Sequence, residues 1–151
     1  MRAAIVDRPL DPAALLAEVA HHGHGATSLF VGTVRDVNDG RPVLGIEYSA
    51  YRAMAERELG RIIAEAAERF GSDAIVTEHR LGELELGEAS IAIAAAHAHR
   101  APAMDAVRYV IEEVKKRVPI WKRELYVDGT REWVDPTRAG AAPVSPATAE
   151  G

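Results

Sequence analysis

The chain contains no cysteine, few aromatic residues and no excess of positive charge. Without cysteine it forms no disulfide framework and no thiolate zinc site, and it has no cysteine nucleophile. Aromatic residues make up 5% of the 151 residues and the formal net charge is -5. These values argue against nucleic-acid binding, which normally needs a basic surface or a platform for base stacking. Any site for an anion must therefore be a local one.

Long apolar runs are absent as well. The N-terminal stretch MRAAIVDRPLDP lacks the apolar core of a signal peptide, and no segment approaches the roughly 20 apolar residues that span a bilayer. We therefore expect a cytoplasmic protein with no membrane partner. A hydrophobic content of 48% over this length favours one domain with a substantial core.

Hydrophobic spacing predicts three helices. The first covers residues 12–22, where Asp11 and Pro12 give a start signal, and the second runs from Tyr51 to Phe70. The third ends before Pro119. Strands are expected at residues 3–6, 26–36, 43–51, 74–82, 89–99, 120–127 and 131–134.

The order of these elements predicts an α+β fold with mostly antiparallel pairing. We expect strands 26–36 and 43–51 to pair across the turn-forming NDGRP stretch, and strands 120–127 and 131–134 to form a hairpin. The alanine-rich strand 89–99 indicates that a neighbour packs closely on it. Residues 1–134 should form the domain, and the small, proline-bearing stretch 135–151 should be a largely disordered tail.

The segment KKRVPIWKRE gathers five cations in a chain that is acidic overall. Helical spacing sets Lys115 at the edge of the buried stripe, whereas Lys116 and Arg117 have glutamate partners and suit a solvated surface. Strand alternation sets Lys122 on one face with Ile120 and Glu124. Cations are favourable at any helix C-terminus, so the segment is either an ordinary helix end or one wall of an anion pocket.

Two other cationic positions and one histidine cluster can each be interpreted either as part of a binding site or as an ordinary structural feature. Arg35 stands where a strand runs into a turn, and His99 with Arg100 opens the third helix, whose N-terminus attracts anions. Each of these is also an ordinary surface position. The HHGHG stretch at residues 21–25 invites a metal interpretation, but no further ligands lie nearby in sequence, so a helix C-terminal cap is favoured and no metal is expected.

The strings FVGTVRD, HRLGELELGE, AAAHAHR and VKKRVPIWKRE, in this order and at these separations, resemble the large, catalytic subunit of molybdopterin synthase. The resemblance covers nearly everything from Ala3 to Val134. It implies an α/β hammerhead fold with additional antiparallel sheet and a central homodimer. A small ubiquitin-like sulfur-carrier subunit at each end would complete a heterotetramer.

The same resemblance implies a sulfurtransferase reaction. The C-terminal Gly-Gly tail of the carrier, as a thiocarboxylate, would enter the active site and deliver two sulfurs to cyclic pyranopterin monophosphate, precursor Z. The product would be the dithiolene of molybdopterin, in molybdenum cofactor biosynthesis, and no cofactor is expected on the subunit itself. The absence of cysteine fits this reaction, since the sulfur must arrive on another molecule.

Matching the family motifs residue by residue gives Lys115 and Lys122 as catalytic candidates. The positions expected to bind substrate are Thr33, Val34, Arg35, His99, Arg100, Lys115, Lys122, Arg123 and Glu124. Arg138 is the candidate for an arginine that the family borrows from the partner protomer. Two alternatives remain open: a non-enzymatic module that binds an anion or nucleotide for regulation, and an inactive paralogue that serves as a scaffold.

Overall fold

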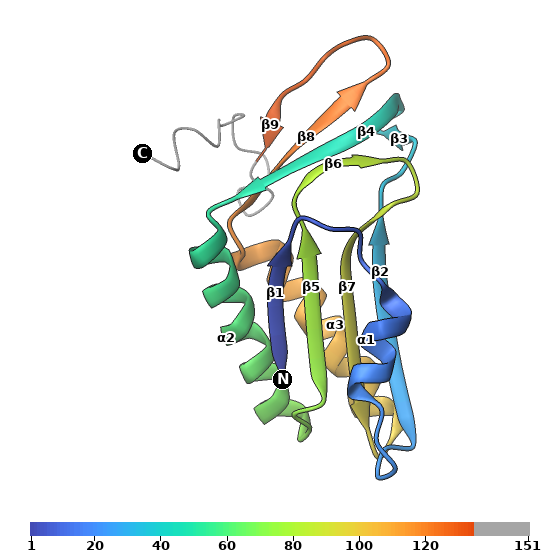
Figure 1. Cartoon of the computed structure of the whole chain (residues 1–151), viewed down its shortest axis with the longest axis vertical. Helices are drawn as coiled ribbons and strands as arrows, with labels where there is room; N and C mark the ends of the chain where they lie inside the picture. The colour runs from blue at the N-terminus through green and yellow to red at the C-terminus, as the bar shows by residue number, and fades with distance from the viewer. Residues whose placement is uncertain (135–151) are drawn as a thin grey trace.

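The structure is a computed structural model that describes residues 1–134, and Figure 1 traces the chain through them. The helices are α1 (Pro12–Val19), α2 (Arg52–Phe70) and α3 (Arg100–Arg117). The strands are β1 (Arg2–Val6), β2 (Ala26–Thr33), β3 (Val37–Asn38), β4 (Arg41–Ala50), β5 (Ile75–Arg80), β6 (Gly82–Glu85), β7 (Ala89–His97), β8 (Ile120–Tyr126) and β9 (Trp133–Val134). The expected tail and Arg138 lie outside the described residues, and both stay predictions.

Two sheets organise the described part of the chain. The first has the strand order β1-β5-β7-β2, and the second has the order β3-β4-β8-β9 with β6 paired to β4. Among the described strands only β1 and β5 run parallel. Figure 1 shows the second sheet lying across one end of the first. The predicted α+β fold with mostly antiparallel pairing is therefore confirmed.

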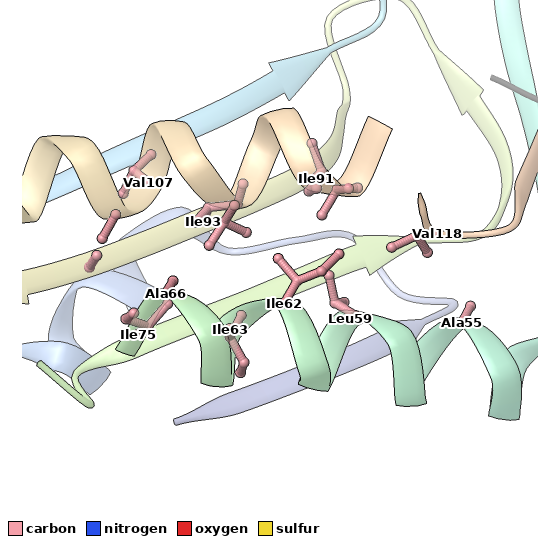
Figure 2. Packing of buried hydrophobic residues seen from close by; sticks show 14 of the residues in the cluster. Ala55, Leu59, Ile62, Ile63, Ala66, Ile75, Ile91, Ile93, Val107 and Val118 are labelled. Carbon is pink, nitrogen blue, oxygen red and sulfur yellow. The ribbon is translucent and has the colours of Figure 1, made fainter. Parts of the chain in front are cut away.

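Helices cover both faces of the first sheet. Leu59 and Ile62 of α2 and Val110 of α3 are fully buried in one cluster with Ile93 of β7, and Figure 2 shows the α2 side chains pointing at β5 and β7. On the other face, α1 packs Leu15 and Val19 on the alanines of β7. The close packing expected on the alanine-rich strand is thus confirmed, since alanine side chains let a helix approach the sheet.

The two long helices form where the spacing predicts. Helix α2 ends at Gly71, whose φ of 74° closes the last turn in the left-handed conformation that glycine adopts readily. Helix α3 begins after the N-cap His99 and ends at Arg117, with Val118 as the C-cap directly before Pro119. Its last turn carries Lys115 and Lys116, so the cationic segment does lie at a helix C-terminus.

One predicted pairing is wrong. Strands β2 and β4 do not pair with each other; β2 pairs with β7, and β4 pairs with β3, β6 and β8. The NDGRP turn is real, with Asp39 at φ 50° and Gly40 at φ 76°, and positive φ at both central residues is typical of tight hairpins. It joins the two-residue strand β3 to β4, after the chain has already left the first sheet.

Two further boundaries differ from the sequence prediction. Helix α1 stops at Val19 rather than residue 22 because Ala20 adopts extended backbone angles. The stretch between β5 and β7, expected to be a simple connection, forms strand β6, and its residues 82–85 pair with β4. The predicted hairpin at the end of the described chain is confirmed by the pairing of β8 with β9.

Candidate functional site

A pocket of about 440 Å³ opens where the C-terminal end of α3 meets both sheets. Seven elements contribute to its wall, so neither sheet alone could form it. Its lining consists of Phe30, Gly32, Thr33, Arg35, Val37, Ile46, Tyr48, His79, Ser90, Ile91, Ile111, Val114, Lys115, Val118, Ile120, Lys122 and Glu124. About half of these residues are apolar, and the others include three cations and one carboxylate.

Lys115 reaches the pocket from the last turn of α3. Ile111 and Val118, four residues before it and three after it, line the same pocket, as expected for one face of a helix. Lys115 itself is exposed, so its stem follows an apolar wall while the ammonium group remains near the mouth. This is the position at the edge of the buried stripe that the helical spacing predicts.

Lys122 enters the pocket from β8, directly opposite Tyr48 of β4 in the strand register. Its ammonium lies 3.7 Å from a carboxylate oxygen of Glu124. The other oxygen of Glu124 accepts hydrogen bonds from Asn38 and from the Tyr126 hydroxyl, the latter at 2.6 Å. Glu124 is therefore held from two sides beside the Lys122 ammonium, and its predicted contact with substrate stays a prediction.

Thr33 and Arg35 reach the pocket from the end of β2, with Val34 between them. The Val34 side chain is buried against Ile46 and Leu84. Its amide donates to the Glu88 carbonyl at 3.0 Å and its own carbonyl accepts from the Gly87 amide at 2.9 Å. Val34 therefore anchors the segment that presents Arg35, and its backbone groups are already engaged.

His99 and Arg100 lie at the opposite end of α3 from Lys115. Arg100 and Lys115 are fifteen positions apart in the helix, which corresponds to about 22 Å along the axis at about 1.5 Å per residue. Both residues are exposed, and neither lines the pocket. Within one chain the structure does not bring them together with the two lysines, and their role in substrate binding stays a prediction.

The remaining cations of the KKRVPIWKRE segment are occupied elsewhere. Lys116 is exposed and pairs with Glu113 at 3.7 Å, which confirms the surface interpretation. Arg117 pairs with Glu113 at 3.5 Å, as the spacing predicts. It is less exposed than predicted, with 28% of its side chain accessible, because it also bridges α3 to Glu58 and Glu65 of α2, the latter at 2.6 Å. These carboxylates hold the pKa of Arg117 above its ordinary value.

Arg123 lies on the face of β8 that points away from the pocket. It pairs with Glu47 of β4 and stacks over the Trp133 ring, with its guanidinium carbon 4.7 Å from the ring centroid. The strand alternation predicted for this segment is therefore correct. Arg123 stabilises the second sheet in this arrangement, and its predicted contact with substrate stays untested.

The HHGHG stretch forms a turn beyond α1. The His24 ring nitrogen Nδ1 lies 3.3 Å from the Val19 carbonyl at the helix end, and Gly23 donates its amide to His21 at 3.0 Å. Neither glycine of the stretch has a positive φ, and the C-cap residue of α1 is Ala20, so the predicted glycine cap is wrong and the stretch reaches the helix end only through the His24 ring. Within residues 1–134, no group of three or more histidine and carboxylate side chains is arranged to hold a metal ion.

The pocket also contains polar residues to which sequence reasoning gave no role: His79, Tyr48 and Ser90. Burial lowers the pKa of His79 to about 4, although the hydrogen bond to the Arg80 carbonyl raises it in part. Burial likewise raises the pKa of the Tyr48 phenol, and the nearby Ser90 hydroxyl opposes this shift. The signal for His79 was a histidine inside an apolar strand pattern, which predicts burial without predicting a pocket.

This arrangement suits a ligand with an apolar body and anionic groups. The cations Arg35, Lys115 and Lys122 outnumber the single carboxylate Glu124, so the pocket is locally positive in an acidic protein. Fixed cations in a partly dry site stabilise negative charge on bound anions and on atoms that become charged during a reaction.

Comparison with known proteins identifies the family. The family model described as "MoaE protein" matches residues 5–117. The chain belongs to the MoaE family. A relative named molybdopterin synthase catalytic subunit from Emericella nidulans is 45% identical over 82% of the chain, and a relative of the same name from Oryza sativa subsp. indica is 45% identical over 93%. The chain spans 64% of the length of the first and 76% of the second.

Solved structures agree with the MoaE assignment. A crystal structure of molybdopterin synthase from Staphylococcus aureus superposes with a TM-score of 0.80 at 33% identity, covering 87% of this chain and 95% of that one. A complex of subunits 1 and 2 of molybdopterin-converting factor from Helicobacter pylori gives 0.68 at 26% identity, covering 85% and 87%. The predicted family is confirmed, and with it the hammerhead fold with additional antiparallel sheet.

Proposed function

We propose that the chain is the catalytic subunit of molybdopterin synthase, a sulfurtransferase in molybdenum cofactor biosynthesis. It would take two sulfurs from the C-terminal thiocarboxylate of a small sulfur-carrier subunit and deliver them to cyclic pyranopterin monophosphate. The observation that carries this proposal is the convergence of Lys115 and Lys122 with Arg35 on one pocket with apolar walls.

The pocket's charges match the two anionic partners of this reaction. Arg35, near the mouth, is suited to the pterin phosphate, because a guanidinium binds phosphate through two parallel hydrogen bonds. The ammonium groups of Lys115 and Lys122 are suited to the carrier's thiocarboxylate and to the charge that develops on sulfur and oxygen during transfer. We infer that Lys115 also moves a proton or accepts the acyl group transiently.

His99 and Arg100 enter this proposal only through a second copy of the chain. Because α3 holds them about 22 Å from Lys115, they contribute to substrate binding where a partner protomer brings its own helix N-terminus to the pocket. The homodimer, with a carrier at each end, is therefore part of the proposal. The related complex of two subunits from Helicobacter pylori supports a protein partner.

No described helix is long and apolar enough to cross a membrane. The cytoplasmic location expected from the sequence stays a prediction.

Mixing the chain with thiocarboxylated carrier and precursor Z tests the proposal, with dithiolene product as the readout. The synthase proposal predicts tight binding of the carrier and formation of product. Binding of the carrier without product would favour the inactive scaffold. Failure to bind the carrier, combined with binding of a nucleotide or phosphometabolite, would favour the regulatory module.

A further inference from the structure

His79 occupies a fixed position in the middle of the first sheet. Strand β5 lies between β1 and β7, and His79 stands opposite Ile5 on one side and Ile91 on the other. The residue is 6% exposed, and the small part that remains accessible faces the pocket that contains Lys115 and Lys122. A side chain on a central strand moves little, so whatever His79 offers to a ligand is held in place.

One ring nitrogen of His79 is already in use. Nδ1 lies 2.9 Å from the carbonyl oxygen of Arg80, and because a carbonyl can only accept, Nδ1 must carry the hydrogen. In the neutral ring Nε2 is then an unprotonated acceptor. The Tyr48 ring meets the imidazole edge-on, with the centroids 5.0 Å apart and the planes at 76°, so packing also fixes the rotation of the ring.

The pocket is graded from a mouth of exposed cations to a largely buried inner part, where Glu124, with a side chain 10% exposed, is the one carboxylate of the lining. Lys115 and Arg35 are exposed, whereas His79, Ser90 and Ile91 are 6%, 7% and 5% exposed. Burial keeps the imidazole uncharged at neutral pH, so the inner wall offers a hydrogen-bond acceptor without adding a fourth positive charge. A ligand that fits this gradient has a flat ring with N–H groups at one end and an anionic group at the other.

We propose that His79 is a substrate-positioning residue whose Nε2 accepts a hydrogen bond from a ring N–H of the pterin. This inference rests on the proposed function and specifies which end of the bound substrate lies deepest in the pocket. The heterocycle lies inward against His79 and the apolar wall, while Arg35 and the two lysines hold the phosphate and the thiocarboxylate near the mouth. Loss of the acceptor should weaken binding of the heterocycle and leave binding of simple anions unchanged.

Two substitutions separate the acceptor from the packing. His79→Phe keeps a flat ring against Tyr48 but removes Nε2, whereas His79→Gln places an amide oxygen near the position of Nε2 and keeps an acceptor. His24→Phe is the matched control, since His24 also has Nδ1 beside a backbone carbonyl but lies outside the pocket.

Calorimetric titration of each full-length variant with precursor Z, and separately with inorganic phosphate, tests the inference. His79→Phe should bind precursor Z about tenfold more weakly, the effect of one lost hydrogen bond, with unchanged phosphate affinity. His79→Gln and His24→Phe should remain close to wild type. In turnover with the carrier, His79→Phe should raise the KM for precursor Z more than it lowers kcat.

Equal affinity of folded His79→Phe and wild type for precursor Z would overturn the inference, as would equal losses in the Phe and Gln variants. If His79→Phe does not fold, His79→Met replaces it with the same expectation. A wild type that binds no precursor Z would instead contradict the proposed function, so the two failures are distinguishable.

Discussion

Among single residues, the lysines that face the pocket should matter for turnover and those that do not should be dispensable. Lys122 lines it, whereas Lys116, six residues earlier, is exposed and pairs with Glu113 outside it. Lys122→Ala should lower turnover by about 10²-fold, the usual cost of losing one fixed donor to a developing negative charge. Steady-state dithiolene formation measures this, and Lys116→Ala, which removes the same charge elsewhere, should remain within twofold of wild type.

The burial of His79 should make the free energy of unfolding depend on pH. Between pH 6.5 and about 4 the unfolded chain binds a proton at His79 that the folded chain does not, so stability falls as pH falls. In the same pocket the cations Arg35, Lys115 and Lys122 oppose a charged imidazole and the Glu124 carboxylate favours it, so burial decides the direction of the shift. From pH 7 to pH 5 the free energy of unfolding of wild type should drop by about 2 kcal/mol more than that of His79→Gln.

Urea unfolding of both proteins at the two pH values measures this difference. If the free energy of unfolding fell by the same amount from pH 7 to pH 5 in wild type and in His79→Gln, the imidazole would protonate as easily in the folded chain as in the unfolded chain.

At the scale of elements, two glycines should respond oppositely to the same substitution. A Cβ at Gly45 of β4 would lie 2.6 Å from the Leu84 carbonyl oxygen of β6, whereas a Cβ at Gly60 of α2 would meet nothing within 4 Å. Gly45→Ala should cost about 1–3 kcal/mol, because two paired backbones must separate. Gly60→Ala should stabilise by about 0.5–1 kcal/mol, because alanine is the better helix former. Urea unfolding measures both changes, and a change in the free energy of unfolding of the same sign in the two variants would contradict this expectation.

The sequence predicted where the helices and strands lie better than it predicted which strands pair with each other. The stripe on α2 and the alternation on β8 were readable because each depends on one segment and its burial. The pairing of β2 with β7 was not readable, because about 60 residues separate these strands and a turn signal nearby favoured a local hairpin. The two-residue strand β3 satisfied that signal instead.

The site was likewise predictable only where its residues belong to local sequence motifs. Lys115, Lys122, Glu124, Arg35 and Thr33 meet in the pocket as the family motifs implied. His79 was not assigned a role, because only the tertiary arrangement turns a buried strand position into a pocket wall.

At the scale of the whole molecule, the length of α3 makes a prediction about assembly. If Arg100 serves the pocket of a partner protomer, inactive Lys115→Ala and Arg100→Ala proteins should complement each other when mixed. In mixed dimers one pocket carries both defects and the other carries neither, so about a quarter of all pockets should be intact after random exchange. Dithiolene formation before and after exchange of subunits measures this, and no recovery in exchanged dimers would place both residues in one chain's site.

In the proposed function, the cationic segment at the end of α3 forms an active site for sulfur transfer. A single-turnover reaction of the protein with thiocarboxylated carrier and precursor Z tests this most directly, comparing wild type with Lys115→Ala and Lys115→Arg. We expect product from wild type and almost none from Lys115→Ala despite normal carrier binding. Lys115→Arg should show a strong loss, because arginine keeps the charge but exchanges no proton. Full turnover by Lys115→Ala would contradict the account.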